Sequence, residues 1–104
     1  MNTETHLYGE NNFLDALQFM ASLPDDQVQV RVYVSDSGYS PVIVSVEGSG
    51  RDCIGVRTAR SNTPKHWRSL DRLAGFLHVA GCHRFQVVNC SVSAIFNDSD
   101  GESL

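Results

Sequence analysis

The sequence predicts an α+β fold, with a mainly antiparallel sheet of about four strands and two helices packed on one face. Apolar residues recur at helical spacing near residues 13–21 and 70–80, whereas the region between them alternates apolar and polar residues. Clusters of turn residues separate the alternating runs. With 104 residues, 41% of them hydrophobic, the chain suits one domain with its own core. We expect residues 1–104 to form that domain, with 1–10 and 97–104 flexible.

The first helix is predicted to begin at Asn12, a capping residue followed three positions later by Asp15. Pro24 cannot continue a helix and is expected to end it. The apolar stripe of this helix consists of Phe13, Leu14, Leu17, Met20 and Ala21.

Three strands follow, in the predicted element order α-β-β-β-α-β. Residues 27–34 alternate, so that every second residue from Val28 to Val34 faces one side. A turn at 35–38 leads to a second run whose core face is expected to hold Val42, Val44 and Val46. Gly48-Ser49-Gly50 turns the chain into a shorter strand near 53–58. Short turns between successive strands favour an antiparallel meander.

The second helix is predicted to be capped by Ser69 and closed by Gly81 as a left-handed residue. Its stripe consists of Leu70, Leu73, Ala74, Leu77 and Ala80. A final strand is expected to start at 84–88 and to extend toward Val92. The predicted core gathers residues that each lie on one face of one element: Val28, Val30, Val32, Val44, Val46, Ile54, Val56, Leu70, Leu73, Leu77, Phe85 and Val87.

No cofactor or metal is expected from the cysteines and histidines. The candidate ligands are Cys53, His78, Cys82, His83 and Cys90, but Cys82 and His83 are adjacent and His78 lies within a predicted helix. Such spacing does not suit the tetrahedral ligand set of zinc. Three cysteines cannot all pair within one chain, so reduced thiols are expected.

The sequence also predicts a protein without enzymatic activity. Cys53 with Arg57 and Arg60 has the residue types of a phosphatase-type nucleophile, yet the segment predicts a strand where an anion-cradling loop is needed. Carboxylates within the predicted elements are isolated, and no pair suggests general acid–base catalysis.

The most informative feature is the concentration of basic residues in the middle of the chain. Residues 51–84 hold seven of the eight lysines and arginines and two aspartates, a net charge of +5, while the remainder has one arginine and ten carboxylates, a net charge of −9. A basic face on an acidic body can attract an anionic partner. The candidate partner-binding residues are Arg57, Arg60, Lys65, Trp67, Arg68 and Arg72.

Three interpretations of these six residues stay open at this point. Aromatic and arginine side chains anchor protein interfaces, and aromatic residues among cations also stack on nucleic-acid bases. Alternatively, Trp67 packs inward against the helix start, and the cations form a solvated rim.

Part of this region is similar to a known family. The residues concerned are Val56-Arg57-Thr58-Ala59-Arg60, Trp67-Arg68-Ser69-Leu70-Asp71-Arg72-Leu73, Gly81 and Arg84-Phe85-Gln86-Val87. Over residues 55–87 this pattern resembles the small plasmid partition-associated (ParC-like) accessory proteins. The resemblance implies an origin in a mobile element and an accessory, non-enzymatic role, and it carries no catalytic residue across.

The expected function is that of an accessory or regulatory protein of a bacterial mobile genetic element, which binds a partner macromolecule in plasmid partition or maintenance. One alternative is an anti-defence inhibitor, similar to anti-CRISPR proteins, that binds a host protein complex. Another is a nucleic-acid-binding module that uses residues 51–84. A protein partner is expected first, because the acidic balance of the chain weakens binding to nucleic acid.

Location and assembly complete the expectations from sequence. No apolar run approaches the ~18–20 residues of a membrane span, and no secretory signal is seen, so we expect a cytoplasmic protein without a membrane partner. The oligomeric state, monomer or homodimer, stays open.

Overall fold

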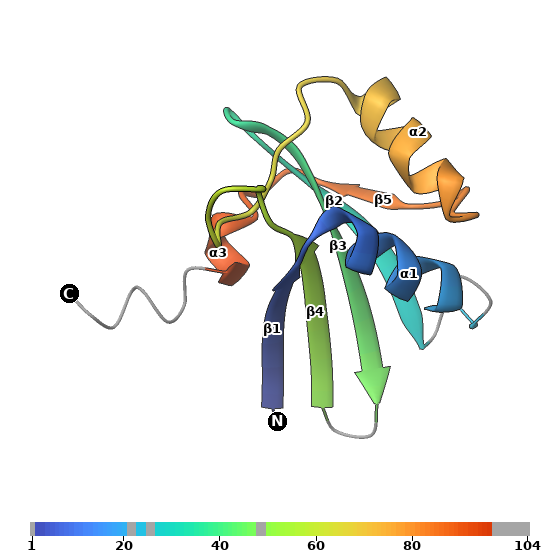
Figure 1. Ribbon diagram of the computed structural model, residues 1–104. Helices are drawn as coiled ribbons and strands as arrows, with labels where there is room; N and C mark the ends of the chain where they lie inside the picture. The colour runs from blue at the N-terminus through green and yellow to red at the C-terminus, as the bar shows by residue number, and fades with distance from the viewer. Residues whose placement is uncertain (1, 21–22, 25–26, 48–49, 97–104) are drawn as a thin grey trace.

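A computed structural model describes residues 2–20, 23–24, 27–47 and 50–96, and it confirms the α+β class. Its sheet has five strands in the order β1-β4-β3-β2-β5 (Figure 1). Within the described residues, no helix is long and apolar enough to cross a bilayer. The elements are β1 (Asn2–Tyr8), α1 (Glu10–Met20), β2 (Val28–Ser35), β3 (Gly38–Glu47), β4 (Gly50–Val56), α2 (Leu70–Val79), β5 (Gln86–Val88) and α3 (Ser93–Phe96).

The centre of the sheet is the antiparallel meander that the turn signals predict. β2 pairs with β3 from Val28↔Ser45 to Ser35↔Gly38, and β3 pairs with β4 on its other side. Both edges of the sheet differ from this antiparallel centre. At one edge β1 runs parallel to β4, and at the other β5 runs parallel to β2. Parallel neighbours need a crossover rather than a tight turn, so these two edges join segments far apart in sequence.

The sequence predicts flexible residues at 1–10 and no strand before the first helix, but the structure has a strand there. Asn2–Tyr8 form β1, which pairs with β4 along its whole length, from Asn2↔Gly50 to Tyr8↔Val56. Its sequence is mainly polar and lacks an apolar alternation, because an edge strand has little core to contact, although Tyr8 does pack against the core. The matching expectation for 97–104 lies outside the described residues.

α1 begins two residues earlier than predicted. The amide of Phe13 donates to the carbonyl oxygen of Gly9 at 2.9 Å, so the helix starts at Glu10 directly after β1 and is not capped by Asn12. The carboxylate of Glu10 lies in the first turn, where the helix dipole stabilises negative charge.

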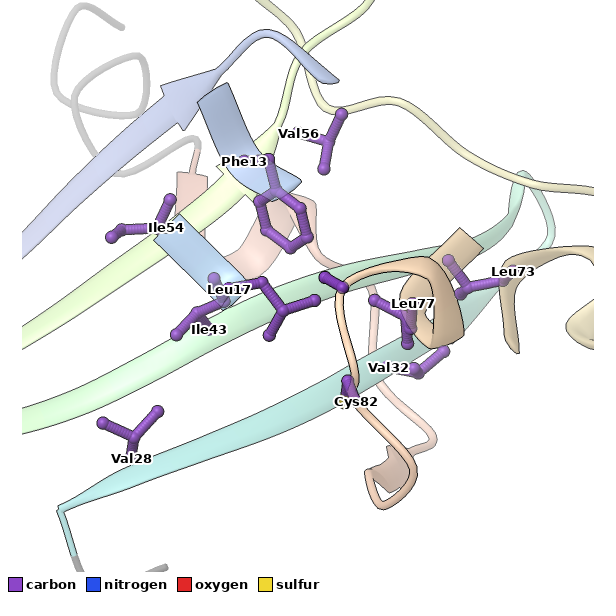
Figure 2. Packing of buried hydrophobic residues seen from close by; sticks show 11 residues of the cluster. Phe13, Leu17, Val28, Val32, Ile43, Ile54, Val56, Leu73, Leu77 and Cys82 are labelled. Atoms are coloured by element: carbon purple, nitrogen blue, oxygen red, sulfur yellow. The ribbon is translucent and has the colours of Figure 1, made fainter. Parts of the chain in front are cut away.

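α1 and α2 cover one face of the sheet (Figure 1), as the sequence predicts. Phe13 and Leu17 from α1 meet Leu73 and Leu77 from α2, and all four side chains are fully buried (Figure 2). Beneath them lie the sheet residues Val28, Val32, Ile43, Ile54 and Val56.

The opposite face of the sheet carries a second, smaller core. Val42, Val44 and Cys53 are buried there with Tyr33, under Val92 and the partly buried residues of α3. Val44 is buried as predicted, but it lies in this smaller core and not on the face of the β2 valines. Because Val30 pairs with Ile43, it is Ile43 that shares their face. A one-residue offset inverts every side chain of a strand, and a continuous apolar run hides that offset.

Most other predicted details are confirmed, with two exceptions near the end of the chain. The Ser69 hydroxyl caps α2 by accepting from the amide of Arg72, and Gly81 is left-handed with a φ of 87°. Val87 is 52% exposed, because β5 is a short edge strand. β5 also stops at Val88, since the chain turns at Cys90, well before Val92. Among the other predicted core residues, Val30, Leu70 and Phe85 are only partly buried, and the side chain of Val46 is outside the described set. All the others are buried.

Truncation of Leu73 to alanine should lower the free energy of unfolding by about 2–5 kcal/mol, because it leaves a cavity where α2 meets the sheet. Urea denaturation measures this change. Val79→Ala is the control, since Val79 lies on the same helix with 76% of its surface exposed and should change stability by less than about 0.5 kcal/mol. Equal losses for both variants would contradict the assigned helix face.

Candidate partner-binding surface

The connecting segment, residues 57–69, joins β4 to α2 and holds all but one of the candidate residues. It crosses the end of the sheet where β4 ends and β3 begins (Figure 1). Its backbone is held there by hydrogen bonds: the amide of Lys65 donates to the Val56 oxygen at 2.7 Å, and Tyr39 and Trp67 exchange two bonds of 2.7 and 2.8 Å. The buried Ser40 hydroxyl also donates to the Lys65 oxygen at 2.8 Å. The segment therefore extends the sheet and is not a free loop.

Gly38 explains how the segment comes so close to the β2–β3 hairpin. Its φ of 121° is a conformation that L side chains rarely adopt, and a β carbon there would lie 2.4 Å from the carbonyl oxygen of Trp67. Only glycine allows the hairpin turn and this backbone contact together.

Trp67 packs inward, as in the third of the interpretations that the sequence left open. It is half-buried, and its ring centroid lies 4.8 Å from that of Phe76 on α2, which in turn stacks 6.1 Å from Phe13 on α1. The Lys65 ammonium lies 5.1 Å from the Trp67 ring and forms an ion pair with Glu10. The two residues thus tie the connecting segment to both helices, and Lys65 already has a counter-charge.

The remaining four candidates form what we call the arginine surface: Arg57, Arg60, Arg68 and Arg72. Three of them are exposed, whereas Arg57 is half-buried with its guanidinium beside Gly9. It directly follows the end of β4. Within the described part of the chain, no carboxylate forms an ion pair with these four arginines.

The arginines occur in two groups, one on each side of Lys65. Arg57 pairs through its backbone with Pro64 next to Lys65, and Arg60 lies in the turn between them. Arg68 and Arg72 flank the Ser69 cap at the start of α2. His66 lies between these groups. Burial lowers the pKa of its imidazole, with a smaller opposing effect of the Pro64 backbone, and this favours the neutral form of the ring.

The cysteines and histidines do not converge. Cys53 lies in the small core on one face of the sheet and Cys82 in the large core on the other, so these two thiols cannot share an ion. His78 and His83 contact each other edge to face at 4.6 Å. Across the residues described, no three metal-ligating side chains come together. Burial raises the pKa of the Cys53 thiol despite nearby Arg51 and Arg31, so at neutral pH it is not the thiolate that nucleophilic chemistry requires.

Comparison of the chain with family models, with curated proteins and with solved structures found no match. Function must therefore be inferred from the geometry and charge of the chain itself. The sequence reasoning missed three residues that shape the surface, namely Glu10, Tyr39 and Phe76. Phe76 lies three residues after Leu73, and this spacing could have placed it on the inner side of α2. Glu10 contacts Lys65 and Tyr39 contacts Trp67, but these contacts join segments far apart in the chain and leave no pattern in the local sequence.

Replacement of Gly38 by alanine should destabilise the fold by at least about 2 kcal/mol, because the methyl group strains the backbone and collides with Trp67. Gly75→Ala is the matched control. A β carbon at Gly75 meets no atom within 4 Å, so this helix substitution should stabilise by about 0.5–1 kcal/mol. Thermal melts of the two variants measure the difference, and an unchanged melt for Gly38→Ala would contradict the contact.

The three thiols should differ in reactivity. Cys90 is exposed, whereas Cys53 and Cys82 are buried and burial raises the pKa of both thiols, so the thiolate that reacts is scarce. At pH 8 a disulfide reagent should modify one thiol of the native protein rapidly and all three after unfolding in guanidinium. Rapid modification of Cys53 in the native protein would show that the small core is open to solvent.

Proposed function

We propose that this chain is a non-enzymatic binding protein that docks its arginine surface on an acidic surface of a partner protein. One observation carries the proposal. Among the described residues, the arginines of this surface have no carboxylate partner, and backbone hydrogen bonds hold the connecting segment to the sheet. A backbone that is already fixed loses less conformational freedom on binding, and guanidinium groups bind carboxylates through two parallel hydrogen bonds. The start of α2 beside Arg68 and Arg72 adds partial positive charge.

A protein partner is favoured over nucleic acid for two reasons. The tryptophan of the connecting segment is half-buried against Phe76, so its ring is poorly placed for base stacking. The whole chain carries a net charge of −4, which repels a long polyanion once it extends beyond the arginine surface. A protein with a limited acidic patch meets the arginines without meeting the acidic body.

We further propose a role in a bacterial mobile genetic element, in plasmid partition or maintenance. This part of the proposal is supported by the resemblance of residues 55–87 to the ParC-like accessory proteins, whose role is also non-enzymatic. The anti-defence alternative uses the same surface and differs in the identity of the partner, so identification of a bound host defence complex would replace the partition role.

Charge reversal tests the surface. The double variant Arg60→Glu/Arg68→Glu should keep the thermal melt of the wild type, since both side chains are exposed, yet weaken partner binding at least about tenfold through slower association. The matched control is Arg51→Glu, which makes the same change at an exposed arginine outside the connecting segment and should bind normally.

The partner is obtained by capture from a lysate of the host, then purified, and its dissociation constant is measured at two salt concentrations. Equal binding by wild type, double variant and control would contradict the arginine surface. Nanomolar binding of the wild type to one DNA sequence in a mobility shift, with steep salt dependence, would replace the protein partner by nucleic acid.

A further inference from the structure

Two histidine side chains lie side by side where α2 ends, at the opposite end of this helix from Arg68 and Arg72. His78 is in the last turn of α2, and His83 lies just beyond Gly81, in the chain that leads to β5. The centroids of the two imidazole rings are 4.6 Å apart, and their planes are inclined at 67°. Both residues are exposed, so a small ion in solution can reach both rings.

The backbone between the two histidines is fixed by a Schellman motif. The amide of Gly81 donates to the carbonyl oxygen of His78 at 2.9 Å, and the amide of Cys82 donates to that of Leu77 at 3.1 Å. These are the two hydrogen bonds of that motif, and Gly81 has the left-handed φ of 87° that it requires. The Cys82 side chain is buried in the large core, which anchors the chain on the far side of the turn. A ligand that engages both rings therefore orders side chains but no backbone.

The separation of the rings suits two ligands of one metal ion. Imidazole nitrogen is the commonest metal ligand in proteins. A metal–nitrogen bond of about 2.0–2.1 Å places a ring centre about 3 Å from the ion, so two rings at roughly 90–110° around it have centres about 4.5–5 Å apart. The observed 4.6 Å lies in this range. The rings now meet edge to face, and rotation about the bonds of these exposed side chains is enough to turn one nitrogen of each toward the same ion.

The ligand set defines the class of site. Among the described residues, no third histidine, cysteine or carboxylate joins the pair, so the site lacks the four protein ligands of structural zinc that the sequence analysis also excluded. Two protein ligands suit an exchangeable ion that keeps water in its other positions. Imidazole favours nickel, copper and zinc, whereas magnesium and calcium prefer oxygen ligands.

We propose that His78 and His83 form a surface site for a divalent transition-metal ion, with water in the remaining positions. Each imidazole binds in its neutral form through one nitrogen, and the ion links the last turn of α2 to the chain that leads to β5. Because the folded backbone brings the two rings together, binding of the ion stabilises the folded state. The site uses no residue of the arginine surface and does not depend on the function proposed for it.

Calorimetric titration of the full chain, made without a histidine tag, with Ni²⁺ tests the proposal. Ni²⁺ is chosen because, unlike Cu²⁺, it does not oxidise the exposed Cys90 thiol. The expected result is one ion bound per chain, with paramagnetic broadening of nuclear magnetic resonance signals centred on residues 78 and 83. Absence of binding, or broadening centred elsewhere, would overturn the site.

Matched variants then assign the ligands. His78→Gln and His83→Gln each remove one nitrogen ligand from an exposed position and should weaken Ni²⁺ binding at least about tenfold, which is roughly 1.4 kcal/mol. His6→Gln makes the same change at an exposed histidine of β1 and should leave Ni²⁺ binding as in the wild type. Equal affinity of the wild type and the two site variants would show that the pair is not the ligand set.

Thermal melts and competition complete the test. Without metal all three variants should melt as the wild type does, and Ni²⁺ should raise the melting temperature of the wild type and of His6→Gln only. Excess Mg²⁺ should leave Ni²⁺ bound, because Mg²⁺ prefers oxygen ligands. Displacement of Ni²⁺ by Mg²⁺ would show general attraction of cations to an acidic protein and would contradict binding by imidazole.

Discussion

Burial of β3 on both faces is the constraint on which the rest of the fold depends. From Ser40 to Val44 every residue of this strand is buried, so neither face of the sheet can be left to water. α1 and α2 cover one face, and the short segment from β5 to α3 covers the other. Each buried side chain of this kind contributes roughly 1.5–3 kcal/mol by leaving water. The helices α1, α2 and α3 are therefore placed by the need to cover the two faces of this strand.

The same central strand also fixes the candidate surface. The start of β3 binds the connecting segment through the backbone of Tyr39 and the hydroxyl of Ser40, and Gly38 allows that close approach. The segment is then held by Trp67 against Phe76 and by Lys65 against Glu10. Two of the six candidate residues thus serve mainly to position the segment. The arginines around them gain a fixed backbone, which is the property on which the proposed binding role rests. The proposed arginine surface offers long-range attraction, which acts on the rate of association and weakens with salt.

The sequence by itself determined the local elements: alternation identifies the meander, helical spacing identifies two helices, and Ser69 and Gly81 mark the bounds of α2. These features depend on neighbours along the chain. It also located the basic segment, because charge is a property of composition. Only the tertiary structure decided what depends on distant contacts. β1 exists because β4 pairs with it. Val44 on β3 faces away from the valines of β2 because of the register between these two strands. Trp67 faces inward because Phe76 lies there. Strand register and residue contacts between remote segments leave no periodic pattern in a single sequence, which is the physical reason that they could not be predicted.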